Sequence, residues 1–111
     1  MGDYAAARPL LHECLALYRT LRTHRRFLYV LFHYLCMAVR EQDFERAAMI
    51  WGFEEAFRES TGIPRPPQIG ERYQAEEDAA RLHLGAERFV SQAARGAQMP
   101  EEEMIAFLLN G

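Results

Sequence analysis

His33 and Cys36 are the side chains whose types and spacing come closest to a metal-binding pair. They lie three residues apart, and Met37 follows His33 by four residues, so a helix would bring all three near one face. Imidazole nitrogen and sulfur are common ligands of zinc and of haem iron. A structural metal site needs about four ligands, and no second pair with such spacing is present. We therefore expect core residues here, with no metal and no other cofactor.

Three groups of neighbouring glutamates could provide acid–base catalysis. They lie at residues 54–55, 76–77 and 101–103. All fall on the expected polar faces or first turns of helices, where carboxylates are normally solvated. A catalytic carboxylate needs burial or a perturbing neighbour. We therefore expect no catalytic residues and a protein that is not an enzyme.

The basic residues cluster around the first expected turn of the chain. Arg19, Arg22, Arg25 and Arg26 lie there together with His24. This cluster could bind a phosphate or an acidic partner, although exposed charged turns are commonly just solvated. No aromatic residues alternate with these arginines, and the net charge of the whole chain is −3. We therefore expect no direct contact with nucleic acid.

The two cysteines and the longest apolar run indicate the compartment. Cys14 and Cys36 both fall in apolar helical patterns and are expected as buried thiols, as in a reducing environment. The longest apolar run, residues 27–39, is shorter than the roughly 20 residues that span a bilayer. The sequence therefore predicts a cytoplasmic protein without a membrane partner.

Aromatic residues are concentrated in the first half of the chain. Together with Trp51 they could line a groove for a peptide or a small ligand. At helical spacing, however, aromatic residues more often form the core. The residues concerned, besides Trp51, are Phe27, Tyr29, Phe32, Tyr34, Phe53 and Phe57.

Apolar periodicity and capping residues predict an all-α chain of six helices. Asp3 and Asp43 are expected to be N-caps, and Gly62, Gly85 and Gly96 are expected to end helices. The expected helices cover residues 3–21, 26–41, 43–61 and 68–84, a short segment ending at Gly96, and a last segment with Pro100 in its first turn. We expect one domain, in which repeat helices (1–62) and capping helices (68–111) are joined by a stiff proline-rich linker (63–67).

The first expected helix is too apolar to have a single neighbour. Leu10 and Leu17 widen its apolar arc well beyond the usual stripe of about 100°. The second helix is apolar nearly all round and is expected to be the central element. We therefore expect the first helix to self-associate or to dock against a partner. Its main apolar face is expected to consist of Tyr4, Ala7, Leu11, Cys14, Leu15, Tyr18 and Leu21.

A short pattern recurs after 40 residues. Residues 3–7 (DYAAA) and 43–47 (DFERA) each combine an acidic cap, an aromatic residue and an alanine at the start of a long helix. Such a period is typical of helix–turn–helix repeat arrays, whose surfaces bind other molecules. Both segments resemble the second helices of tetratricopeptide-type repeats. The resemblance implies close helix packing at Ala7 and Ala47, and it makes residues 26–41 the first helix of the next repeat.

The resemblance is more specific downstream and extends over almost the whole chain. Residues 46–52 (RAAMIWG), 62–67 (GIPRPP) and 84–106 resemble the unit that closes the repeat region of large multidomain bacterial signalling ATPases. Those proteins combine a nucleotide-binding switch domain with an effector, often a LuxR-type or other helix-turn-helix DNA-binding domain, sometimes a cyclase or kinase. Without any lysine, this chain cannot form the lysine-containing phosphate-binding loop of such a switch.

The resemblance implies a non-enzymatic protein-interaction and sensor module, the terminal repeat segment of a bacterial transcriptional or signalling regulator. The chain would then be a fragment or a stand-alone remnant that begins at the second helix of a repeat. Its partners would be its own upstream repeats, the switch domain or another chain, including a homodimer through the first helix. The alternatives are a stand-alone dimeric adaptor and, less favoured, a small helical enzyme or metal-binding protein.

The expected partner-binding surface lies on the first helix. The central helix is too apolar to face water, so a groove would be lined by the first and third helices. Arg8, His12, Arg19 and Glu54 are the polar side chains that could orient a partner there, and arginine is favoured at binding hot spots. Leu10 and Leu17 would provide the apolar contact.

Overall fold

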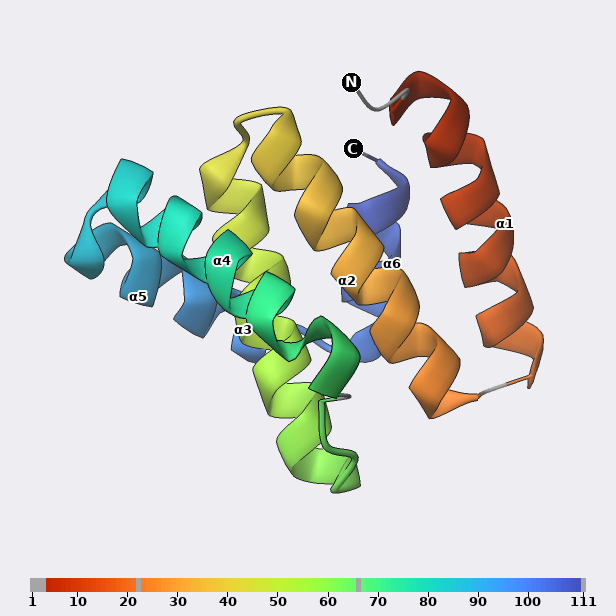
Figure 1. Cartoon of the computed structure of the whole chain (residues 1–111). Helices are drawn as coiled ribbons and strands as arrows, with labels where there is room; N and C mark the ends of the chain where they lie inside the picture. The colour runs from red at the N-terminus through yellow and green to blue at the C-terminus, as the bar shows by residue number, and fades with distance from the viewer. Residues whose placement is uncertain (1–3, 22, 66, 111) are drawn as a thin grey trace.

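The computed structural model describes residues 4–21, 23–65 and 67–110, and within these ranges it contains helices and no strand (Figure 1). This confirms the expected all-α class, while the tetratricopeptide-like superhelix stays a prediction. In Figure 1, α2 and α3 run through the middle, α1 flanks α2, and α5 lies on the far side of α3. The helices are α1 (Tyr4–Leu21), α2 (His24–Arg40), α3 (Phe44–Thr61), α4 (Pro67–Leu84), α5 (Ala86–Ala97) and α6 (Glu101–Leu109).

Local signals determine several helix ends as expected. The Asp43 side chain accepts a hydrogen bond from the backbone nitrogen of Arg46 at 3.2 Å and so caps α3. Gly62 follows α3 with φ 73°, and Gly85 separates α4 from α5 with φ 87°. Both angles lie in the left-handed region, which glycine adopts without strain. Asp3, the expected cap of the first helix, lies outside the described residues.

The starts of α2 and α6 differ from the expected ones. α2 begins at His24 because Thr23, with extended backbone angles, occupies the N-cap position. The turn after α1 is therefore shorter than expected, and Arg25 and Arg26 lie in the first turn of α2. Pro100 is the N-cap of α6 and does not lie in its first turn. The glutamates that follow do occupy that turn, where carboxylates complement the helix dipole.

α2 is the central, most buried helix, as its sequence predicted. Near its start, the Phe27 ring stacks on the Tyr18 ring at a centroid distance of 4.2 Å and meets the edge of Phe57 at 5.1 Å. This aromatic cluster joins α1, α2 and α3. Tyr29 and His33 on α2 are exposed. The buried residues of α2 are Phe27, Leu28, Val30, Leu31, Phe32, Tyr34, Leu35, Cys36, Met37, Ala38 and Val39.

α3 and α5 cross at two glycines. A Cβ atom added at Gly52 would lie 2.0 Å from the carbonyl oxygen of Ala93, and one added at Gly96 would lie 1.9 Å from that of Met49. The two backbones therefore touch where any side chain would separate them. The expectation that Gly96 ends the fifth helix is wrong. Gly96 lies inside α5, which continues to Ala97, and its function is close helix packing.

α6 runs behind α2 in Figure 1 and contacts both α1 and α3. The Arg19 guanidinium on α1 donates to the Glu102 carboxylate at 2.8 Å, and the Tyr18 hydroxyl donates to Glu101. Arg46 on α3 donates to the carbonyl oxygens of Phe107 and Leu108 at 3.2 and 3.0 Å. The C-terminal helix thus connects the first and third helices of the chain. Its buried side chains are Met104, Ile105 and Leu108.

Candidate functional site

α1 exposes a line of three leucines to solvent. Leu10, Leu17 and Leu21 are 64%, 50% and 59% exposed. Their spacing of seven and four residues places them along one line of the helix, which we call the leucine stripe. Leu15 and Tyr18, which face the other helices, are fully buried. Leu21 was expected on that packed face, but as the last residue of α1 it is exposed.

The predicted polar residues of α1 lie on a different side of the helix from the stripe. Arg8, His12 and Arg19 are four and seven residues apart, so they follow one line of their own. At 3.6 residues per turn, that line lies about half a turn from Leu10 and Leu17. The predicted apolar and polar parts of the partner-binding surface therefore do not form one surface.

All three of these polar side chains have partners within the chain. Arg8 forms an ion pair with Glu41 just after α2 at 2.6 Å, and Arg19 pairs with Glu102 on α6. The imidazole Nδ1 of His12 shares a 2.6 Å hydrogen bond with the hydroxyl of Tyr34. Burial raises the pKa of Tyr34 to about 12, so this phenol stays neutral at physiological pH. These contacts attach α1 to α2 and α6.

Glu54 belongs to a separate, buried cluster. Its side chain is 2% exposed, and its two carboxylate oxygens accept hydrogen bonds from Arg58 at 2.9 Å and Arg65 at 3.0 Å. Both arginines also pair with Glu55, and the Arg65 guanidinium stacks 3.7 Å from the centroid of the Tyr73 ring. The cluster ties the proline-rich linker to α3 and α4. The structure therefore does not bring Glu54 together with Arg8, His12 and Arg19.

The expectation that the paired glutamates are solvated is wrong for two of them. Glu54 and Glu76 are buried. Arginines from other turns or helices explain this, because Arg58 and Arg65 reach Glu54 while Arg40 reaches Glu76 at 3.0 Å. A carboxylate can be buried when a cation and hydrogen bonds compensate its lost hydration.

A hollow of about 390 Å³ opens where α1, α2 and α4 meet. It brings together His33 and Cys36, the pair that the sequence singled out, with Cys14 and with Arg72 of α4. His33 is exposed at this hollow, so its expected place in the core is wrong. Sequence reasoning missed Arg72, because nothing in the local sequence of α4 indicates that it packs beside α2. The other residues that line the hollow are Ala7, Leu10, Leu11, Met37 and Arg40.

The pKa values of His33 and Cys36, two of the α2 groups at this hollow, are both shifted in the direction that favours the neutral form. Burial, together with the neighbouring Glu76 carboxylate, raises the pKa of the Cys36 thiol to about 12. Partial loss of hydration also lowers the pKa of the His33 imidazole, and the positive charge of Arg72 acts in the same direction. The hollow therefore presents a neutral imidazole and an unreactive thiol beside an arginine.

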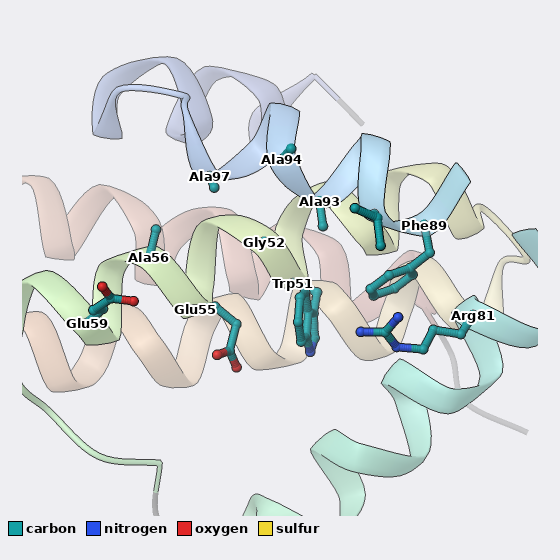
Figure 2. A pocket seen from close by; sticks show the side chains of 11 residues that line it. Trp51, Gly52, Glu55, Ala56, Glu59, Arg81, Phe89, Ala93, Ala94 and Ala97 are labelled. Carbon is teal, nitrogen blue, oxygen red and sulfur yellow. The ribbon is translucent and has the colours of Figure 1, made fainter. Parts of the chain in front are cut away.

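A second concavity, of about 350 Å³, lies where α3, α4 and α5 meet. Figure 2 shows the Arg81 guanidinium beside the rings of Trp51 and Phe89, at 5.6 and 4.2 Å from their centroids, and the two rings pack on each other at 5.2 Å. Glu55 and Glu59 line the groove farther along α3. Of the predicted aromatic groove residues, Trp51 lines this concavity, whereas Phe27, Phe32, Tyr34 and Phe53 are buried in the core.

The described residues contain no group of three or more His, Cys, Asp or Glu side chains placed to hold a metal ion. None of the described helices combines the length and the apolar character needed to cross a bilayer. No protein-family model, curated protein or solved structure matches the sequence.

Proposed function

We propose that this chain is a non-enzymatic protein-interaction and sensor module, the terminal repeat segment of a cytoplasmic bacterial transcriptional or signalling regulator. The single observation that supports an interaction function is the leucine stripe of Leu10, Leu17 and Leu21. Exposed apolar surface of this kind marks contact sites between proteins. The regulatory setting is supported by the tetratricopeptide-like sequence features alone.

An apolar helix of a partner protein is the occupant that suits the stripe. Complete burial of a leucine side chain stabilises a complex by about 1.5–3 kcal/mol. Three leucines in one line match a facing helix that presents its own apolar line. In the full regulator, the facing helix would come from upstream repeats or the switch domain. In the isolated chain, a second copy can supply it through the same surface.

Light scattering of the isolated chain tests this proposal. We expect self-association that Leu17→Glu abolishes, because a carboxylate cannot be buried there without a partner. Leu82→Glu is the matched control, since Leu82 on α4 is 81% exposed and lies outside the stripe. Arg8 and Arg19 are poorer probes because reversing their charge would also break the ion pairs that hold α1.

Three results would contradict the proposal. The first is a wild-type chain that stays monomeric at the highest soluble concentration, and the second is an equal loss of association in the Leu82→Glu variant. The third is one tightly bound transition metal per purified chain, which would favour a metal-binding helical protein. The remaining alternative, a stand-alone dimeric adaptor, is distinguished by whether the coding sequence extends upstream of Met1.

A further inference from the structure

The hollow between α1, α2 and α4 has mostly apolar walls. Leu10 and Leu11 come from α1 and Met37 from α2, and Leu10 borders both the hollow and the leucine stripe. The hollow has a volume of about 390 Å³. At roughly 30 Å³ for a group the size of a water molecule, it has room for a ligand of about a dozen non-hydrogen atoms. Clefts of 300–1,000 Å³ with apolar walls and a few polar groups are typical of small-molecule sites.

The polar groups at the hollow are mainly cationic. The Arg72 guanidinium lies over the Phe32 ring at 5.8 Å and has no carboxylate partner among the residues that the structure describes. Arg40 pairs with the buried Glu76 at 3.0 Å, so its charge is balanced. His33 is neutral near pH 7 because its pKa is lowered. Arg72 therefore places a positive charge beside an apolar wall and, among the described residues, forms no ion pair of its own.

We propose that this hollow binds an amphipathic monocarboxylate of medium chain length, with its hydrocarbon chain against α1 and α2 and its carboxylate on Arg72. An arginine guanidinium matches a carboxylate through two parallel hydrogen bonds. The hydrocarbon chain gains from leaving water in proportion to the apolar area that it buries. A dicarboxylate would place a second charge against the apolar wall, and a short acid would lack the hydrocarbon chain that this wall can bury.

This site goes beyond the proposed function and can be tested without it. The ligand would bind to the chain itself, so no protein partner is needed to detect binding. Since Leu10 belongs to both surfaces, an occupied hollow would change the apolar area that the leucine stripe offers to a partner. Ligand binding without self-association, or the reverse, would separate the two proposals.

The reactivity of the Cys14 thiol provides the measurement. Cys14 lines the hollow and is partly accessible, whereas Cys36 is buried. We expect decanoate, below its micelle concentration, to slow alkylation of Cys14 saturably. Decanol, which has no charge, and acetate, which has no long hydrocarbon chain, should protect Cys14 much less. Arg72→Gln should weaken decanoate binding by about tenfold or more, as expected for loss of a charged hydrogen bond.

Arg88→Gln is the matched control for Arg72. Arg88 is also an exposed arginine, but it pairs with Glu45 away from the hollow. Circular dichroism of both variants would show that each is folded. The proposal is overturned if decanoate gives no saturable protection of Cys14 or if decanol protects Cys14 equally well. It is also overturned if Arg72→Gln binds decanoate as tightly as the wild type and the Arg88→Gln control do.

Discussion

Both carboxylates that are buried in the described part of this protein, those of Glu54 and Glu76, are paired with arginines. The Glu54 carboxylate receives one hydrogen bond from each of Arg58 and Arg65, and Glu76 receives one from Arg40. An unpaired carboxylate at either position would cost several kcal/mol of lost hydration. The guanidinium group suits this function because it keeps its charge and offers five donors in a fixed plane.

At the same scale, the two cysteines should differ sharply in reactivity. With a pKa of about 12, the Cys36 thiol is ionised to about one part in ten thousand at pH 8. We expect iodoacetamide to modify one thiol of the native protein between pH 7 and 9, and both thiols in urea. Mass spectrometry would locate the native modification at Cys14.

The same pKa shift has a consequence for stability. The folded pKa of Cys36 lies above its ordinary value, so the folded state holds this proton more tightly than the unfolded chain does. The resulting stabilisation is complete below the ordinary thiol pKa and is lost as the pH rises towards 12. Alkylation of native Cys36 as fast as Cys14 at pH 8 would contradict the burial of this thiol. Cys14→Ser, which should abolish native labelling, is the control.

At the scale of elements, the packing of α3 against α5 depends on the absence of side chains. Gly52 meets the backbone of Ala93, and Gly96 meets that of Met49. Residue numbers rise along α3 from 49 to 52 while those of their partners on α5 fall from 96 to 93, so the two helices are antiparallel at this crossing. Glycine lowers helix propensity by about 1 kcal/mol relative to alanine. Close packing of the two backbones compensates for that loss here.

Two glycine-to-alanine variants test this packing. Gly52→Ala should lower the free energy of unfolding by about 1–3 kcal/mol, because the added methyl group would lie 2.0 Å from a backbone oxygen. Gly70→Ala should raise it by up to about 1 kcal/mol, because Gly70 lies within α4 and an added Cβ would meet no atom of another element within 4 Å. Urea unfolding measures both. Equal effects of the two variants would contradict the close approach of α3 and α5.

At the scale of the whole molecule, α6 is the element that joins the two ends of the chain. It forms side-chain contacts to Tyr18 and Arg19 on α1, and its last carbonyl groups accept from Arg46 on α3. Arg19 contacts α6, and Arg8 and His12 on the same side of α1 contact Glu41 and Tyr34, so this side is engaged within the chain. The leucine stripe remains the exposed apolar surface of α1, which is why the proposed partner docks there.

Arg46→Gln tests how much α6 depends on this connection. The substitution removes the charged donor to the carbonyl oxygens of Phe107 and Leu108, so we expect a loss of about 1.5–3 kcal/mol in the free energy of unfolding. Arg88→Gln, which breaks the exposed pair with Glu45, should cost less than about 1 kcal/mol. Similar losses in both variants would mean that Arg46 does not hold α6 in place.

The sequence by itself determined the features that depend on neighbouring residues. The cap at Asp43, the left-handed glycines 62 and 85, and the apolar surface of α2 follow from side chains within one or two turns. The excess apolar surface of α1 was predictable for the same reason. It follows from how Leu10 and Leu17 are placed around one helix, whatever that helix packs against.

Only the tertiary structure decided the features that join distant residues. Glu54 was predicted at a partner-binding surface, but Arg65 of the linker, eleven residues away, helps to bury it. Glycine is typical of helix ends, so the sequence placed Gly96 at one. The structure shows Gly96 within α5, packed against the backbone of Met49. The hollow at Arg72 likewise requires three helices to meet. Local periodicity holds no information about which distant side chains meet, because that depends on the packing of the whole chain.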